Sequence, residues 1–473
     1  MDMLPGLRPT LIGNRTFDQI TVGETASTER TLTADDIELF AVASGDFNPA
    51  HLDAAYAATD LFRGIVAHGM WGGALISAVL GTKLPGPGTI YLSQDLRFQA
   101  PIRIGDTVTT SVTAQEKWPG THRIAFACRC VNQHGQEVIT GAALVQAPTE
   151  TLSLARTELP EVRLSRHGQF RSLLARAAGQ PPAPMAVAHP CDALSLGAAL
   201  DMAGLGLVVP ILVGPAARIA AAATEAGLDI SQCRMVDAPH SHAAAVQAVS
   251  LVRAGEAALL MKGSLHTDEL MHAVVHAELG LRTGRRLSHV YVMDVPGYPR
   301  PLLITDAAVN VAPTLEDKRD IIQNAIDLAH VMGIDTPRVA ILAAVETVNP
   351  AMRSTLDAAA LCKMADRGQI TGGLLDGPLA FDNAVSPEAA RLKGIVSQVA
   401  GRADILVVPD LEAGNMLAKQ LSFLAGADAA GVVVGARVPV ILTSRSDSAR
   451  TRVASCAVAV LMARTGAAGL GPK

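Results

Sequence analysis

The hydrophobic pattern of the chain changes near residue 148, and this change most constrains the fold. Between Thr89 and Ala147, four segments alternate apolar and polar residues, with turn signals such as NQHGQ between them. Alternation with a period of two predicts strands of an antiparallel sheet. The strongly apolar segment Ile65 to Leu80, rich in Gly and Ala, predicts a helix for this sheet to wrap around. The first part of the chain is therefore expected to be an α+β domain.

Beyond Pro148 the chain alternates short apolar runs with helical stretches. PMAVAH is followed by ALSLGAALDMAG, and ADILVVPD is followed by LEAGNMLAKQLSFLAG. Buried strands separated by helices predict an α/β domain with mainly parallel sheets. We expect residues 1–150 to form the first domain, residues 151–165 a polar, Pro-containing linker, and residues 166–473 the second domain. A chain of 473 residues is long enough for two cores.

Composition argues against several classes of partner. The net charge of −5 gives no electrostatic reason to expect nucleic acid or an anionic membrane surface. Even the apolar stretch Val453 to Ala463 falls short of the about 20 residues that span a bilayer. The first residues lack the basic start and apolar run of a secretory signal, and six cysteines in a chain this long do not make a disulfide framework. We expect a cytoplasmic protein.

Two spacings invite a metal-site interpretation that the surrounding residues do not support. Cys128 and Cys130 would face the same side of a strand, but no second pair of cysteines or histidines stands at finger-like spacing. Two thiols in the hydrophobic core are the better interpretation. His272 and His276 have zincin spacing, but position 273 is Ala where the Glu would stand. No metal and no bound cofactor are expected.

Acid–base chemistry is concentrated in the segment SGDFNPAHLD. Asp46 and His51 stand five residues apart, and the Asn48-Pro49 turn between them lets both side chains converge on one small molecule such as water. Imidazole is the natural proton shuttle near neutral pH. The alternative is structural, with Asp46 capping a turn and His51 beginning the next helix. Spacing alone does not separate the two interpretations.

The segment IVAHGMWGGALIS places a glycine near the start of an apolar helix. The N–H of Gly69 would be open to an acceptor there, and the helix dipole would favour an oxygen that gains negative charge. Close packing of helix against strand is the alternative reason for a glycine, and it is the better one for Gly72 and Gly73.

These segments, followed by LPGPGTIYLSQDLRFQAPIRIGD, resemble the MaoC-like, R-specific enoyl-CoA hydratases of the hot-dog fold over roughly residues 15 to 147. The resemblance implies that Asp46 and His51 activate water for addition across a 2-enoyl thioester, and that Gly69 binds the thioester oxygen. It also implies an active-site role for Ser77, and we expect Asn48, inside the Asp-x-Asn-Pro-x-His motif, to contact substrate. The implied product is an (R)-3-hydroxyacyl-CoA.

In the second domain, PVILTSRSDSA joins an apolar strand to a helix that begins near Ser448. Strand ends beside helix N-termini bind anionic ligands in open α/β sheets, and the guanidinium of Arg445 suits phosphate. The alternative is that Ser446, Asp447 and Ser448 simply cap the helix.

Two further strand ends carry polar residues. Lys262 follows the apolar run ALLM, and Asp306 and Asn310 follow LLIT. Thr314 and Asp317 beyond them are explained as a helix cap, whereas Asp306 and Asn310 have no such explanation from sequence. We expect Lys262, Asp306 and Asn310 to bind substrate.

With LLDGPLAFDNAVSPEAA and ADILVVPDLEAGNMLAKQLSFLAGA, these segments look like the phosphate acetyl/butyryltransferase family over roughly residues 165 to 465. The resemblance implies an isocitrate-dehydrogenase-like α/β fold and interconversion of acyl-CoA plus phosphate with acyl phosphate plus CoA. It implies that Ser444 and Arg445 hold the acyl and phosphate groups while an aspartate deprotonates the CoA thiol. The family's acid stands six residues after the arginine, where this chain has Thr451, so Asp447 is the nearest candidate. The MKG and SRSDS runs look more like the butyryl branch.

Together the two resemblances predict a bifunctional enzyme that uses CoA thioesters and inorganic phosphate as substrates and forms a homo-oligomer. A second interpretation keeps only the hydratase half as an enzyme and makes the other half a CoA- or phosphate-binding or oligomerisation module. A CoA- or phosphate-sensing regulatory protein and a decarboxylating dehydrogenase of related fold are further alternatives.

Overall fold

The computed structural model describes residues 11–155, 168–442 and 448–465, together with residues 159, 162 and 164. The chain divides into two compact units, Met1–Leu164 and Ser165–Lys473. Among the residues described, no helix has both the length and the apolar composition that crossing a membrane requires.

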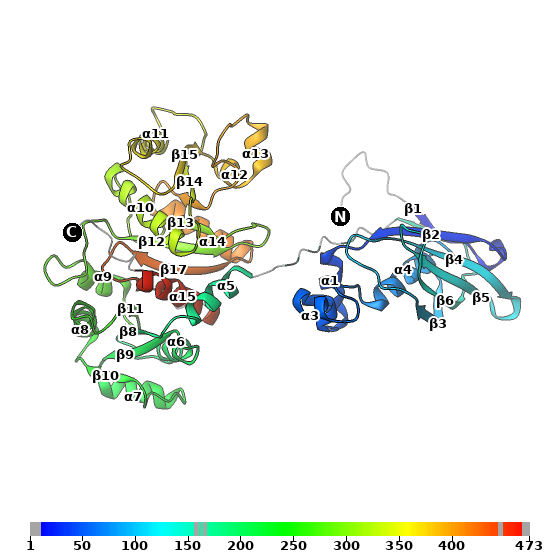
Figure 1. Cartoon of the computed structure of the whole chain (residues 1–473), viewed down its shortest axis with the longest axis horizontal. Helices are drawn as coiled ribbons and strands as arrows, with labels where there is room; N and C mark the ends of the chain where they lie inside the picture. Colours follow the sequence, from blue (N-terminus) through cyan, green and yellow to red (C-terminus); the bar gives the residue numbers. More distant parts are fainter. Residues whose placement is uncertain are drawn as a thin grey trace. The chain divides into compact units, whose positions relative to one another are not determined.

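The first unit is built on a five-stranded antiparallel sheet in the order β2-β4-β5-β6-β3. Its strands are β2 (Thr25–Thr31), β3 (Ile90–Phe98), β4 (Thr107–Trp118), β5 (Arg123–Val131) and β6 (Glu137–Gln146). Helix α4 (Gly69–Thr82) packs against β2 and β4 (Figure 1). The smaller elements are β1 (Leu11–Gly13), which pairs with β7 (Ser153–Ala155), and the helices α1 (Ala34–Ser44), α2 (Pro49–Leu52) and α3 (Ala54–Thr59). The predicted antiparallel sheet around a central helix is confirmed.

Helix α4 begins four residues later than the apolar pattern predicts. The Ala67 N–H donates to the Ile102 carbonyl at 2.8 Å, and Val66 forms an isolated antiparallel bridge with Arg103. The segment before Gly69 therefore follows an extended path, because its backbone groups pair with a neighbouring segment rather than along a helix. The site residues at the start of α4 owe their position to this path.

The core of the first unit lies between α4 and the inner face of the sheet. Ile76 and Val79 of α4 are fully buried in the same apolar cluster as Phe126 of β5. Cys128 and Cys130, also on β5, are free thiols in this core. The prediction of two core thiols is confirmed.

The second unit contains one 11-stranded sheet in the order β10-β9-β8-β11-β18-β17-β12-β13-β16-β14-β15. The strands are β8 (Ala183–Ala188), β9 (Val208–Gly214), β10 (Arg234–Asp237), β11 (Leu259–Lys262), β12 (Ser288–Asp294), β13 (Leu302–Thr305), β14 (Arg338–Leu342), β15 (Leu374–Leu379), β16 (Ile405–Val407), β17 (Asp428–Val434) and β18 (Val440–Ile441). The predicted α/β class is confirmed, with all of these strands in a single mixed sheet.

Helices follow most strands of this unit, as expected for a sheet that is buried on both faces (Figure 1). They are α5 (Gly168–Ala178), α6 (Ala193–Gly204), α7 (Ala216–Glu225), α8 (Ser241–Arg253), α9 (Thr267–Val275), α10 (Leu315–Val331), α11 (Arg353–Asp366), α12 (Phe381–Val385), α13 (Pro387–Leu392), α14 (Leu411–Leu424) and α15 (Ala449–Thr465).

The sheet consists of two parallel groups of strands that run in opposite directions. Strands β10, β9, β8, β11 and β18 are mutually parallel, and so are β13, β16, β14 and β15. Between the groups, β17 is antiparallel to both β18 and β12, and β12 is antiparallel to β13. The carboxyl ends of the two groups therefore point toward opposite edges of the sheet.

Candidate functional sites

The loop that carries Asp46 is shaped by a helix end and a helix start. Helix α1 ends before Gly45, which adopts the left-handed conformation with φ 76° that glycine tolerates best. Three residues further on, Asn48 caps α2, because its side-chain oxygen accepts the N–H of Ala50 at 3.1 Å and Pro49 occupies the first helical position. This turn places His51 on the one-turn helix α2, close to Asp46.

Asp46, His51 and His68 form one cluster. A carboxylate oxygen of Asp46 and one ring nitrogen from each histidine all lie within 4.8 Å of one another. The Nδ1 of His51 lies 2.8 Å from the carbonyl oxygen of Val66. A carbonyl only accepts, so Nδ1 carries the hydrogen and, in the neutral ring, Nε2 keeps the free lone pair that a general base requires.

A cavity of about 290 Å³ adjoins this cluster. His51, His68 and Gly69 line it together with apolar side chains, among them Phe98 and Ile139. Gly69 is the first residue of α4, and within residues 11–155 its amide N–H has no hydrogen-bond acceptor. A Cβ on Gly69 would lie 2.9 Å from a ring carbon of Phe98, so only glycine fits here without a shift of that ring. The cavity thus combines an acid–base cluster, an open N–H at a helix start and an apolar wall.

Not every residue expected in the first site reaches the cavity. His51 and Gly69 line the cavity, whereas Asp46 is not among its lining residues and joins the site through its approach to His51 within 4.8 Å. Ser77 is exposed on α4, eight residues beyond Gly69 and so about 12 Å along the helix axis, and it does not line the cavity. Asn48 uses its side chain to cap α2. His68 was assigned no role from sequence, although its place directly before Gly69 in IVAHGM was the available signal.

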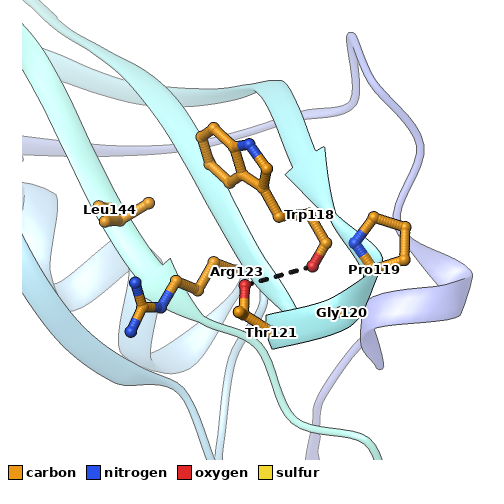
Figure 2. Close-up of a pocket in the computed structure, with 6 residues that line it drawn as sticks. All are labelled: Trp118, Pro119, Gly120, Thr121, Arg123 and Leu144. Carbon is orange, nitrogen blue, oxygen red and sulfur yellow. Dashed lines mark hydrogen bonds between the residues drawn. The ribbon is translucent and has the colours of Figure 1, made fainter.

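A larger hollow of about 490 Å³ lies elsewhere in the first unit. Figure 2 shows its lining at the turn between β4 and β5, where Trp118 and Arg123 stand beside Leu144 of β6. None of the residues predicted for catalysis lines it. Size alone does not identify the site here, because the smaller cavity is the one that His51, His68 and Gly69 line.

In the second unit, Ser444, Arg445 and Asp447 lie outside the described residues. The flanking elements have the expected form, since β18 ends at Ile441 and α15 begins at Ala449. Ser448 caps α15, because its hydroxyl accepts the N–H of Thr451 at 3.0 Å. Thr451, which stands where the family's acid is expected, is therefore in the first turn of α15.

Lys262 lies at the edge of the sheet where β18 also ends. Strands β11 and β18 are parallel neighbours with Met261 opposite Ile441, so Lys262 and Leu442 are at the same level. The half-buried Lys262 ammonium donates to the carbonyl oxygens of Gly263 at 3.4 Å and Leu265 at 3.3 Å. A cation therefore stands beside the strand end that leads into the predicted phosphate-binding segment.

Asp306 and Asn310 have structural partners that sequence did not reveal. Asp306 is 3% exposed, and its carboxylate accepts the backbone N–H groups of Ala308, Val309 and Asn310 at 3.0–3.1 Å. The Asn310 amide also donates to Asp306 and to the carbonyl of Leu287. These bonds hold the turn after β13. Because β13 runs opposite to β11, this turn and Lys262 do not share a sheet edge.

Comparison with known proteins identifies relatives of both units. The profile described as "Phosphate acetyl/butaryl transferase" matches residues 240–460, and the one described as "MaoC like domain" matches residues 18–132. The phosphate acetyltransferase of Rhizobium meliloti is 64% identical over 295 residues, which cover 62% of this chain and 93% of that protein.

Solved structures give corresponding matches. A branched-chain phosphotransacylase from Enterococcus faecalis V583 is 31% identical, with a TM-score of 0.54, and the match covers 59% of this chain and 99% of that chain. The unliganded R-hydratase PhaJ1 from Pseudomonas aeruginosa is 45% identical, with a TM-score of 0.32, over 33% of this chain and 99% of that chain.

Proposed function

Because the chain belongs to the phosphate acetyl/butyryltransferase family and also carries a MaoC-like domain, we propose that it is a bifunctional acyl-CoA enzyme. The MaoC-like domain precedes the transferase part in the sequence. The first unit hydrates 2-enoyl-CoA to (R)-3-hydroxyacyl-CoA. The second unit transfers a short acyl group reversibly between CoA and phosphate. The observation that carries the first half of the proposal is the approach of Asp46 and His51 to within 4.8 Å beside the cavity at Gly69.

In the proposed hydration, the oxygen of water bonds to C3 of the enoyl group. Asp46 and His51 take one hydrogen from this water and return a proton to C2. As the bond forms, negative charge moves to the thioester oxygen, and the open N–H of Gly69 at the start of α4 stabilises it. The apolar walls around Phe98 and Ile139 take the acyl chain. The size of the cavity, about 290 Å³, suits the acyl end of the thioester rather than the whole CoA.

In the proposed transfer, an oxygen of phosphate attacks the carbonyl carbon of the acyl thioester, and CoA leaves as a thiolate that takes up a proton. In reverse, Asp447 removes the proton of the CoA thiol, whose sulfur attacks acyl phosphate. Ser444 and Arg445 hold the acyl and phosphate oxygens, and Lys262 adds positive charge at the same strand edge. The family relationship and the position of Lys262 support these roles.

A second candidate is that only the first unit is an enzyme and the second binds CoA or phosphate without turnover. The observation in its favour is Thr451, which stands where the family's acid is expected and hydrogen-bonds within the cap of α15. We also propose that the protein forms a homo-oligomer. The exposed apolar side chains at the end of α14, Phe423 and Leu424, support an interface there, since their exposed fractions are 78% and 85%.

Two assays on the intact chain test the bifunctional proposal. Loss of the enoyl absorbance of crotonyl-CoA measures hydration, and phosphate-dependent release of CoA from acetyl-CoA or butyryl-CoA measures transfer. Asp46→Asn is expected to lower the rate of hydration by a factor of about 10²–10⁴ and to leave the rate of transfer unchanged. Arg445→Ala is expected to lower the rate of transfer and to leave the rate of hydration unchanged. A wild-type chain that binds both substrates but turns over neither would refute the proposal. Hydration without transfer would establish the second candidate.

A further inference from the structure

His68 is buried at the centre of the first site, although the hydration mechanism above gives it no role. Its side chain is only 2% exposed. Its ring packs against those of Phe40 and His51, with centroid separations of 5.1 Å and 4.0 Å. The residue is also the N-cap of α4, but its side chain makes no capping hydrogen bond. The ring is therefore fixed by packing against one of the two predicted acid–base residues.

One nitrogen of the His68 ring binds the loop of the other acid–base residue. Nε2 lies 3.0 Å from the main-chain carbonyl oxygen of Asp46. Because a carbonyl only accepts, Nε2 carries the hydrogen, and in the neutral ring Nδ1 is then an acceptor. This bond ties the exposed loop of Asp46 to the start of α4, where the N–H of Gly69 is open.

The other nitrogen is buried without a partner. Among residues 11–155, no group donates to Nδ1 of His68. A buried polar atom left without a hydrogen bond destabilises the folded state, so such atoms are expected to meet a water or a substrate group. His68 lines the cavity beside His51, so a molecule bound in this cavity is the group available to meet Nδ1.

We propose that His68 is a third functional side chain of the hydratase, which orients the attacking water by accepting a hydrogen bond from it at Nδ1. The water then donates one hydrogen bond to the Asp46–His51 pair, which removes that hydrogen, and a second to Nδ1 of His68, so that an oxygen lone pair is directed at C3 and the second hydrogen stays on the product hydroxyl. The hydrogen bond from Nε2 of His68 to the Asp46 carbonyl holds the acceptor, Nδ1 of His68, in a fixed position relative to Asp46. This inference rests on the proposed hydration.

Two isosteric substitutions separate the two nitrogens. In His68→Asn the amide oxygen is as many bonds from Cα as Nδ1 is. An acceptor is therefore kept, and the hydrogen bond from Nε2 to the Asp46 carbonyl is lost. In His68→Gln the amide nitrogen stands where Nε2 was, so that hydrogen bond is kept and the acceptor is lost. Loss of one orienting hydrogen bond is expected to lower the rate about 10- to 100-fold, which at about 1.36 kcal/mol per tenfold is about 1.4–2.7 kcal/mol. We expect His68→Gln to lower kcat for crotonyl-CoA by this factor with little change in KM, and His68→Asn to keep a higher kcat than His68→Gln.

The matched control is His134→Asn, which changes an exposed histidine in the turn between β5 and β6 and is expected to leave kcat unchanged. Thermal unfolding of each variant, followed by tryptophan fluorescence, verifies that the first unit is folded, since Trp71 and Trp118 both lie in it. An unaltered kcat in folded His68→Gln, or a lower kcat in His68→Asn than in His68→Gln, would overturn the inference. A wild-type chain that does not hydrate crotonyl-CoA would instead refute the proposed function, so the two failures are distinguishable.

Discussion

A buried histidine of the second unit makes the stability of that unit depend on pH in a predictable direction. His289, on β12, is 2% exposed, and its Nδ1 has no hydrogen-bond partner among the described residues. Burial lowers the pKa of His289 to about 4, although the nearby carboxylate of Asp306 acts in the opposite direction. In the unfolded chain the same ring has its ordinary pKa of about 6.5. Between these two values the unfolded state binds a proton that the folded state does not.

Stability is therefore expected to fall as the pH falls through this window. The free energy of unfolding rises with pH wherever the unfolded state holds more protons. At pH 5 the unfolded His289 is almost fully protonated and the folded one almost fully neutral. With the two pKa values above, this single group removes about 2 kcal/mol of unfolding free energy between pH 8 and pH 5. Carboxylates that titrate in the same range add their own pH dependence.

The substitution His289→Gln isolates the contribution of this one ring. Urea unfolding of the full chain is measured at pH 8 and pH 5 by circular dichroism, and tryptophan fluorescence identifies the transition of the first unit. The loss of unfolding free energy from pH 8 to pH 5 is expected to be about 2 kcal/mol smaller in His289→Gln than in the wild type. His266→Gln, which removes an exposed histidine of the same unit, is expected to behave like the wild type. Equal losses in wild type and His289→Gln would refute the reasoning.

Three further outcomes are expected. Dialysis against EDTA leaves both activities unchanged, because neither proposed mechanism uses a metal; activity lost and then restored by Zn²⁺ would contradict this. Burial raises the pKa of the Cys128 thiol to about 11, so a disulfide reagent at pH 8 should modify Cys128 only after urea unfolding; peptide mapping that finds it modified in the native chain would contradict this. Replacing Phe423 and Leu424 together by Ser should lower the mass measured by light scattering, and an unchanged mass would exclude the end of α14 as the interface.

Local patterns predicted most elements of the fold, because apolar residues recur along those elements with the period of a strand or a helix. The alternating segments became β3 to β6, and ALSLGAALDMAG became α6, which the side chain of Asp192 caps at its start. Strand β2 was not expected, since TASTERT carries polar side chains at almost every position and lies at the edge of its sheet. The start of α4 was placed at Ile65, because the extended path before Gly69 depends on pairing with residues around Ile102 that are distant in sequence.

The residues of the candidate site likewise divide into those that a local pattern predicted and those that depend on contacts distant in sequence. The spacing of Asp46 and His51 was sufficient to bring them together, because a local turn capped by Asn48 sets their geometry. His68 was missed because its contribution depends on a contact with the Asp46 carbonyl, which no local pattern encodes. Ser77 was expected from resemblance alone, and the length of α4 carries it away from the cavity.

The two strand ends of the second unit that carry Lys262 and Asp306 illustrate a more general limit. In sequence both residues follow short apolar strands. If those strands were parallel, the two residues would lie at the same edge of the sheet. The strands β12 and β17, which reverse the direction of the sheet between them, read as HVYVM and AAGVVV and are as apolar as the parallel strands. Direction is thus set by the connections and not by composition. Only strands that run in the same direction have their carboxyl ends at the same edge of the sheet. Lys262 therefore lies at the edge where β18 ends. Asp306 lies at the opposite edge, where its carboxylate holds the turn after β13.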